Sequence, residues 1–70
     1  MEEIKGKTIG DKIKLWRKKK DLTQDALAKR AFIPYTTLPK IETDVIKNPS
    51  LQTITKIAKG LDISLDDLVK

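Results

Sequence analysis

Residues Gln24–Thr43, QDALAKRAFIPYTTLPKIET, contain two short helical patterns separated by one break. Apolar residues recur at helical spacing at Leu27, Ala28 and Ala31 before the break and at Leu38 and Ile41 after it. Two short helices joined by a tight turn form a helix-turn-helix, in which a small residue such as Ala28 suits the crossing. Thr23 is placed to cap the first helix. A hairpin of this size cannot bury its own apolar face, so the rest of the chain must cover it.

The chain is short and contains neither cysteine nor histidine. Its 70 residues allow one domain with a marginal hydrophobic core. Without thiols or imidazoles, disulfides and the usual zinc ligands are excluded, and we expect no metal or cofactor. A reducing cytoplasm is compatible with this composition. No apolar run approaches about 18 residues, and the first residues, MEEIKGKTIG, lack a signal-peptide core, so we expect no contact with a membrane.

The net charge of +5 is unevenly distributed. Residues 1–20 hold eight Lys and Arg against three Asp and Glu, whereas the two classes balance in residues 21–70. A basic segment of this kind is typical of proteins that bind nucleic acid. A solvated lysine-rich helix end explains it equally well, so both interpretations are open.

Apolar spacing and capping residues predict five short helices and an all-α fold. The first expected helix begins at Thr8, and the other four cover residues 24–31, 35–42, 51–61 and 65–69. Residues 1–7 are expected to form a flexible N-terminal tail. The expected caps are Thr8 with Asp11, Thr23, Ser50, and Ser64 with Asp67. We expect Trp16 in the core and Leu15 as a singly exposed leucine.

The chain resembles a Cro/cI-type helix-turn-helix domain of the phage-repressor-like, or XRE, family. The matching pieces are IGDKIKLWRKK, LTQDALAKRA, TTLPKIE and NPSLQTITKIAKGLDISLDDL, in that order over about residues 9–68. The resemblance implies a compact five-helix lambda-repressor-like domain over residues 8–70, with its motif at residues 24–43. Residues 35–42 then form the recognition helix, which enters the major groove of DNA.

The resemblance also assigns roles to individual residues. Base contacts fall to Tyr35, Thr36, Pro39 and Lys40, backbone contacts to Gln24, Thr37, Thr43 and Lys47, and a buried ion pair to Arg17 and Glu42. The chemistry agrees, since Lys40 can donate to guanine O6 or N7 and Thr36 can meet a thymine methyl group. The alternatives are a solvated Lys40 and a surface pair of little energetic value between Arg17 and Glu42.

Two residues depart from the family pattern. Phe32 stands where the family commonly has glycine at positive φ, so either the turn is built differently or the packing of Phe32 offsets its strain. Pro39 is the fifth residue of the predicted helix and removes its hydrogen bond to Tyr35, which predicts a bent or loosened first turn over residues 35–38. We favour a tolerated kink that alters base preference over a loss of base readout.

The sequence therefore predicts a small transcription regulator, expected to be a repressor, that binds double-stranded DNA sequence-specifically. The resemblance implies a bacterial or phage-encoded cytoplasmic protein that forms a homodimer through its C-terminal helix on a palindromic operator. The alternative, motivated by Phe32 and Pro39, is a protein-interaction module of the same fold with weakened DNA readout, antitoxin-like or partner-binding.

Other function classes find less support in the sequence. An enzyme is not expected, because nucleophilic catalysis by cysteine or histidine is excluded and the serines occur only at helix starts. No small-molecule ligand is inferred. A fragment of a longer regulator is disfavoured, since the chain ends on the fifth predicted helix without a linker. Repressor, antitoxin and restriction-controller roles are not separated.

Overall fold

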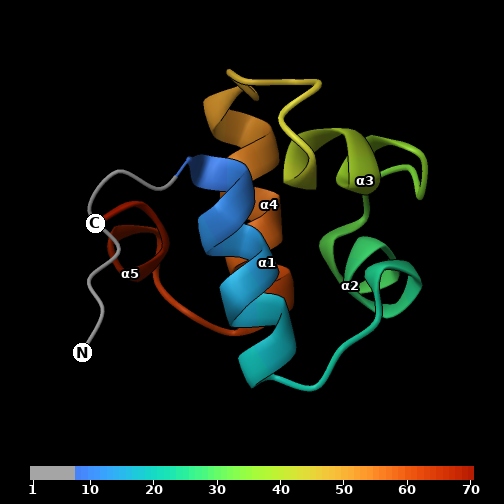
Figure 1. The fold of residues 1–70 in the computed structure, drawn as a ribbon. Coiled ribbons are helices and arrows are strands. Elements are labelled where there is room, and N and C mark those ends of the chain that lie inside the picture. The colour runs from blue at the N-terminus through green and yellow to red at the C-terminus, as the bar shows by residue number, and fades with distance from the viewer. Residues whose placement is uncertain (1–7) are drawn as a thin grey trace.

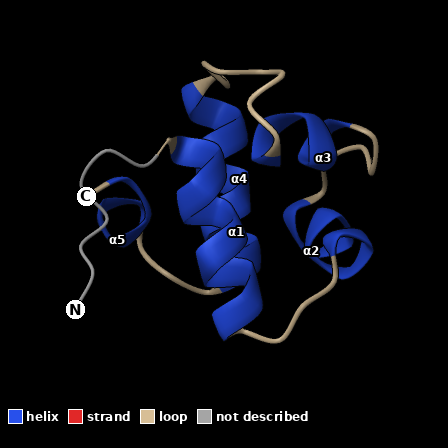
Figure 2. Cartoon of the chain, in the orientation of Figure 1, coloured by secondary structure: helices blue, strands red, loops and turns tan. Residues whose placement is uncertain are grey.

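The computed structural model describes residues 8–70, which form five helices (Figure 1). They are α1 (Ile9–Lys19), α2 (Gln24–Ala31), α3 (Thr37–Glu42), α4 (Leu51–Leu61) and α5 (Leu65–Val69). No strand occurs in this part of the chain (Figure 2), so the predicted all-α class is confirmed. No helix among residues 8–70 is long and apolar enough to cross a membrane. The tail predicted at residues 1–7 lies outside the described residues.

Four of the five helices begin at the predicted caps. Thr8 and Asp11 form a reciprocal capping box, with the Asp11 N–H donating to Thr8 Oγ1 at 3.1 Å. The hydroxyl groups of Thr23, Ser50 and Ser64 likewise accept the N–H three residues further on. Each cap of this kind contributes about 1 kcal/mol. The starts of α1, α2, α4 and α5 are therefore fixed by local side-chain chemistry.

The predicted start of the third helix at Tyr35 is wrong by two residues. Tyr35 and Thr36 lie in a turn, in which the Thr37 N–H donates to the Pro34 carbonyl oxygen at 3.0 Å. Pro39 is consequently the third residue of α3, where an N–H group would have no partner within the helix. The proline therefore costs little at this position. The predicted kink is therefore wrong, because α3 runs without a break from Thr37 through Leu38 and Pro39 to Glu42.

The core lies where α1 and α4 cross the middle of the molecule, with α5 on one side and α2 and α3 on the other (Figure 1). Its fully buried apolar residues are Ile13, Leu27, Ala28, Ala31, Leu38, Ile41, Ile57, Ala58, Leu61 and Leu68. Trp16, predicted as a core residue, is only partly buried and packs against the edge of this cluster. The faces predicted as apolar for α2 and α3 are therefore the faces that the other helices cover.

Close approach between α1 and the end of α3 depends on Gly10. This glycine is buried, and a Cβ atom there would overlap the carbonyl oxygen of Ile41. The same atom would lie 3.0 Å from Asp44 Oδ1. Contact between α1 and the backbone of α3 thus requires a residue without a side chain.

Among residues 8–70, four residues other than glycine have a positive φ. Phe32 has φ 58° as the C-cap of α2, and Asp62 has φ 61° at the equivalent position of α4. Asp21 and Asp44 have φ values of 59° and 65°. The turn after α2 is therefore of the ordinary left-handed kind. Because the side chain of Phe32 is 85% exposed, its packing does little to offset the strain.

Replacing Phe32 with glycine should raise the free energy of unfolding by about 1 kcal/mol. Glycine adopts positive φ without a clash of its Cβ atom, and little apolar burial is lost. Thermal denaturation followed by circular dichroism should show a melting temperature about 4–8 °C higher. Asp62→Gly is the matched control and should gain less, because aspartate tolerates this conformation better than phenylalanine. A lower melting temperature for Phe32→Gly would show that the ring makes stabilising contacts.

Candidate nucleic-acid interface

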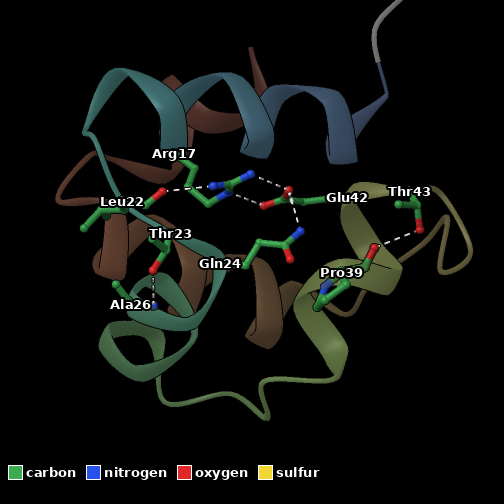
Figure 3. A network of polar contacts seen from close by, with 8 residues as sticks. All are labelled: Arg17, Leu22, Thr23, Gln24, Ala26, Pro39, Glu42 and Thr43. Atoms are coloured by element: carbon green, nitrogen blue, oxygen red, sulfur yellow. Dashed lines mark hydrogen bonds and ion pairs between the residues drawn. The ribbon is translucent and has the colours of Figure 1, made fainter.

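A buried carboxylate joins α1 to the end of α3 (Figure 3). Glu42, only 2% exposed, receives the Nε–H of Arg17 on Oε2 at 2.8 Å and an Nη2–H on Oε1 at 3.1 Å. Arg17 also donates from Nη1 to the carbonyl oxygen of Leu22 at 2.9 Å, just before α2. A two-point guanidinium–carboxylate contact fixes orientation as well as distance. The pair is therefore not a solvent-exposed surface contact, and it ties both ends of the motif to α1.

Gln24, at the start of α2, is part of the same network. Its Nε2 donates to Glu42 Oε1 at 3.1 Å. The amide oxygen is an acceptor and cannot bind a phosphate oxygen directly, so a phosphate contact must use the second N–H of the amide group. Figure 3 shows Gln24 and Arg17 approaching the carboxylate of Glu42 together. The sequence analysis did not predict the bond from Gln24 to Glu42, because the two residues are 18 positions apart and no local spacing indicates their contact.

Thr43 follows α3 and is turned back onto it. Its hydroxyl donates to the carbonyl oxygen of Pro39 at 2.8 Å (Figure 3). A hydroxyl has one hydrogen, so Thr43 in this conformation offers a phosphate only an acceptor. The backbone contact predicted for Thr43 thus requires this hydrogen bond to open. Thr37 is half-buried, and its N–H group is already bonded to Pro34.

The outer surface of α3 and the preceding turn carries the residues predicted to contact bases. Tyr35 is 54% exposed, and Thr36 and Lys40 are exposed as well. Within residues 8–70 these three side chains make no hydrogen bond. Thr36 and Lys40 are four residues apart and share one face, opposite the buried Leu38 and Ile41. A phenol, a hydroxyl and an ammonium group therefore point outward together, while Pro39 is half-buried beside them.

Charges of both signs lie near the predicted phosphate contacts. Lys47 is exposed in the loop after α3. The N-terminus of α2 presents free N–H groups, which favour an anion. The carboxylate of Asp25 lies at the same helix end and forms a weak pair with Lys29 at 4.0 Å. This negative charge opposes phosphate binding, so Lys47 and the remaining N–H of Gln24 are the stronger candidates.

The fold and this outward face can be compared with known proteins. A family model described as helix-turn-helix matches residues 13–68. The chain belongs to this helix-turn-helix family. The chain is 36% identical over 61 residues to the HTH-type transcriptional regulator SinR of Bacillus subtilis (strain 168), covering 87% of this chain and 55% of SinR. It is 40% identical over 62 residues to the immunity repressor protein of Bacillus phage phi105, covering 89% of this chain and 42% of the repressor.

A solved structure of the master regulator for biofilm formation SinR in complex with DNA has the same fold. It superposes on this helix-turn-helix domain with a TM-score of 0.84 at 35% identity, covering 90% of this chain and all of the solved chain. The predicted lambda-repressor-like architecture is confirmed by this similarity. The chain spans about half the length of the curated relatives that it matches, so it corresponds to one part of those proteins.

Proposed function

We propose that this chain binds double-stranded DNA sequence-specifically as a transcription regulator, expected to be a repressor. The main support is the exposure of Lys40 on α3 and of Tyr35 and Thr36 in the turn before it. Because the buried Glu42 anchors that helix, the three side chains can present fixed donors to base edges in the major groove. The relatives named above are a regulator and a repressor, and the SinR structure contains DNA.

The proposed contacts divide into two kinds. Tyr35, Thr36, Pro39 and Lys40 read base edges, with Pro39 offering only apolar contact. Gln24, Thr37, Thr43 and Lys47 contact the sugar-phosphate backbone, subject to the hydrogen bonds already made by Gln24 and Thr43. Base contacts set specificity, whereas backbone contacts set register and much of the affinity. Affinity should therefore fall steeply as salt increases.

The proposed assembly is a homodimer in which α5 contacts its copy. Leu65 and Val69 are one helical turn apart on α5, and Val69 is 44% exposed. Two copies related by a twofold axis would read half-sites about 34 Å apart. Selection of a randomised duplex library by the purified protein, at low and at physiological salt, tests this function. Enrichment of one inverted repeat is the expected result, and salt-sensitive binding without enrichment would contradict sequence-specific readout.

Lys40→Ala should weaken binding to the selected duplex by about 1–3 kcal/mol and relax preference at one base position. The expected cause is loss of donation from the ammonium group to guanine. Fluorescence anisotropy against matched and single-base-changed duplexes measures both effects. Lys47→Ala is the first control and should weaken all duplexes alike. Lys59→Ala, an exposed change near the end of α4, is the second and should leave binding nearly unchanged. Equal losses for Lys40→Ala and Lys59→Ala would remove Lys40 from the site.

A protein-interaction module of the same fold is the second candidate function. It is favoured by Phe32, an apolar ring that is 85% exposed on a strained residue in the turn of the motif. Retention of strain at an exposed residue is typical of a binding role. If the library yields no enriched repeat while Phe32→Gly remains folded, this candidate takes precedence.

A further inference from the structure

A groove of about 220 Å³ lies between α1 and α5, on the side of α1 opposite α3 (Figure 1). Its apolar floor is formed by Leu15, Trp16 and Leu68. Leu15 is 42% exposed, while Leu68 is fully buried beneath it. Leu15 is exposed as predicted, and it lines this groove together with Trp16 and Leu68. None of these residues belongs to the proposed DNA contacts.

Positive charge surrounds this floor. Lys12 Nζ donates to the Val69 carbonyl oxygen at 3.0 Å, and Lys19 Nζ lies 5.0 Å from the centre of the Trp16 ring. Lys70 Nζ lies 3.5 Å from Asp67 Oδ1. Three ammonium groups thus face one carboxylate around the groove. The contacts of Lys19 and Lys70 lie at the surface and contribute little, so either cation can exchange its contact for a carboxylate of an incoming partner.

We propose that this α1–α5 groove binds a short amphipathic helix that is rich in Asp and Glu and belongs to a partner protein. Leucine-type side chains of that helix would pack on Leu15 and the exposed part of Trp16, as in other complexes of a helix with a hydrophobic groove. Its flanking carboxylates would pair with Lys12, Lys19 and Lys70. Charge complementarity of this kind selects the partner and speeds its association.

The two other obvious occupants fit this groove less well. Two copies placed groove to groove would bring their lysines together, and like charges across an interface are unfavourable. DNA could pair its phosphates with the lysines, but it would leave the apolar side chains of Leu15 and Trp16 without a partner. Figure 1 places α5 and α3 on opposite sides of α1, so the partner and DNA can bind at the same time. The groove therefore stands independently of the proposed DNA-binding function.

The probe for this site is a capped 16-residue peptide with leucine on one helical face, glutamate on both flanks and alanine elsewhere. A fluorescein label allows its binding to the full chain to be followed by anisotropy. The control peptide carries lysine at the glutamate positions. The acidic peptide should bind saturably and at least about tenfold more tightly than the control, with affinity falling as salt increases. Trp16 is the single tryptophan, so its emission should change on binding.

Charge-reversal variants test whether the peptide binds in the groove. Lys19→Glu combined with Lys70→Glu should weaken peptide binding at least about fivefold, because two attractive pairs become repulsive. Lys18→Glu combined with Lys59→Glu is the matched control. It removes the same charge outside the groove and should change binding by less than about twofold. Circular dichroism establishes that each variant is folded.

Three results would overturn the proposal. The first is the absence of saturable binding by the acidic peptide. The second is an equal loss in the groove and control variants, since binding would then depend on net charge alone. The third is self-association of the unliganded protein, measured by sedimentation, that Leu15→Glu abolishes, because a second copy would then be the occupant.

Discussion

Replacing Arg17 with methionine is expected to lower the free energy of unfolding by about 3–5 kcal/mol, because one member of a buried ion pair is removed. The side chain of Glu42 is only 1% exposed. After the substitution its charge would be left with the Gln24 amide as its remaining partner. A small domain has a total stability of about 5–15 kcal/mol, so the loss is a large fraction of the total. Urea denaturation followed by circular dichroism measures the loss.

The double variant Arg17→Met, Glu42→Leu separates the cost of losing the ion pair from the cost of leaving the Glu42 carboxylate buried and unpaired. An apolar pair of similar volume commonly restores stability where a single removal does not. We expect the double variant to regain at least about 2 kcal/mol relative to Arg17→Met. Equal destabilisation of the two variants would contradict the proposed cause, since it would mean that the unpaired carboxylate costs nothing.

Gly10→Ala is expected to lower the free energy of unfolding by about 2 kcal/mol. The added methyl group would overlap the carbonyl oxygen of Ile41, a backbone atom that cannot rotate away. Overpacking of this kind typically costs about 1–3 kcal/mol, and the gain of about 1 kcal/mol in helix propensity offsets part of it. The same urea titration gives the value.

The control for Gly10→Ala lies in the same helix. Lys18→Ala also introduces alanine into α1, but at an exposed position, and should change stability by less than about 0.5 kcal/mol. If Gly10→Ala proves neutral or stabilising, α1 and α3 can separate without loss, and the close contact is not needed. The variant should also weaken DNA binding if it remains folded, because α3 would shift relative to α1.

Helix starts could be predicted where a side chain decides them. Thr8, Thr23, Ser50 and Ser64 each accept a backbone N–H, and the signal lies within four residues of sequence. The positive φ of Phe32 was likewise predictable from its position after the last apolar residue of α2. These features depend on local chemistry, so a single sequence contains them.

The start of α3 and the contacts between distant residues of the site could not be predicted from local sequence. Thr36 precedes α3 without capping it, so no local signal separated the helix from the turn before it. The hydrogen bond from Gln24 to Glu42 joins residues 18 positions apart. The groove required the register of α1 against α5, which places Leu15 beside Leu68. Helical spacing could predict which face is outward, but not what a distant helix places beside it.

The residues that hold α3 in the fold and the residues that it exposes are different, so the two sets can change independently in evolution. Leu38, Ile41 and Glu42 are buried and belong to the core and its ion pair. Thr36 and Lys40 are exposed and hold nothing else in place. Under the proposed function, substitutions at these two outward residues would change the preferred operator without rebuilding the interior.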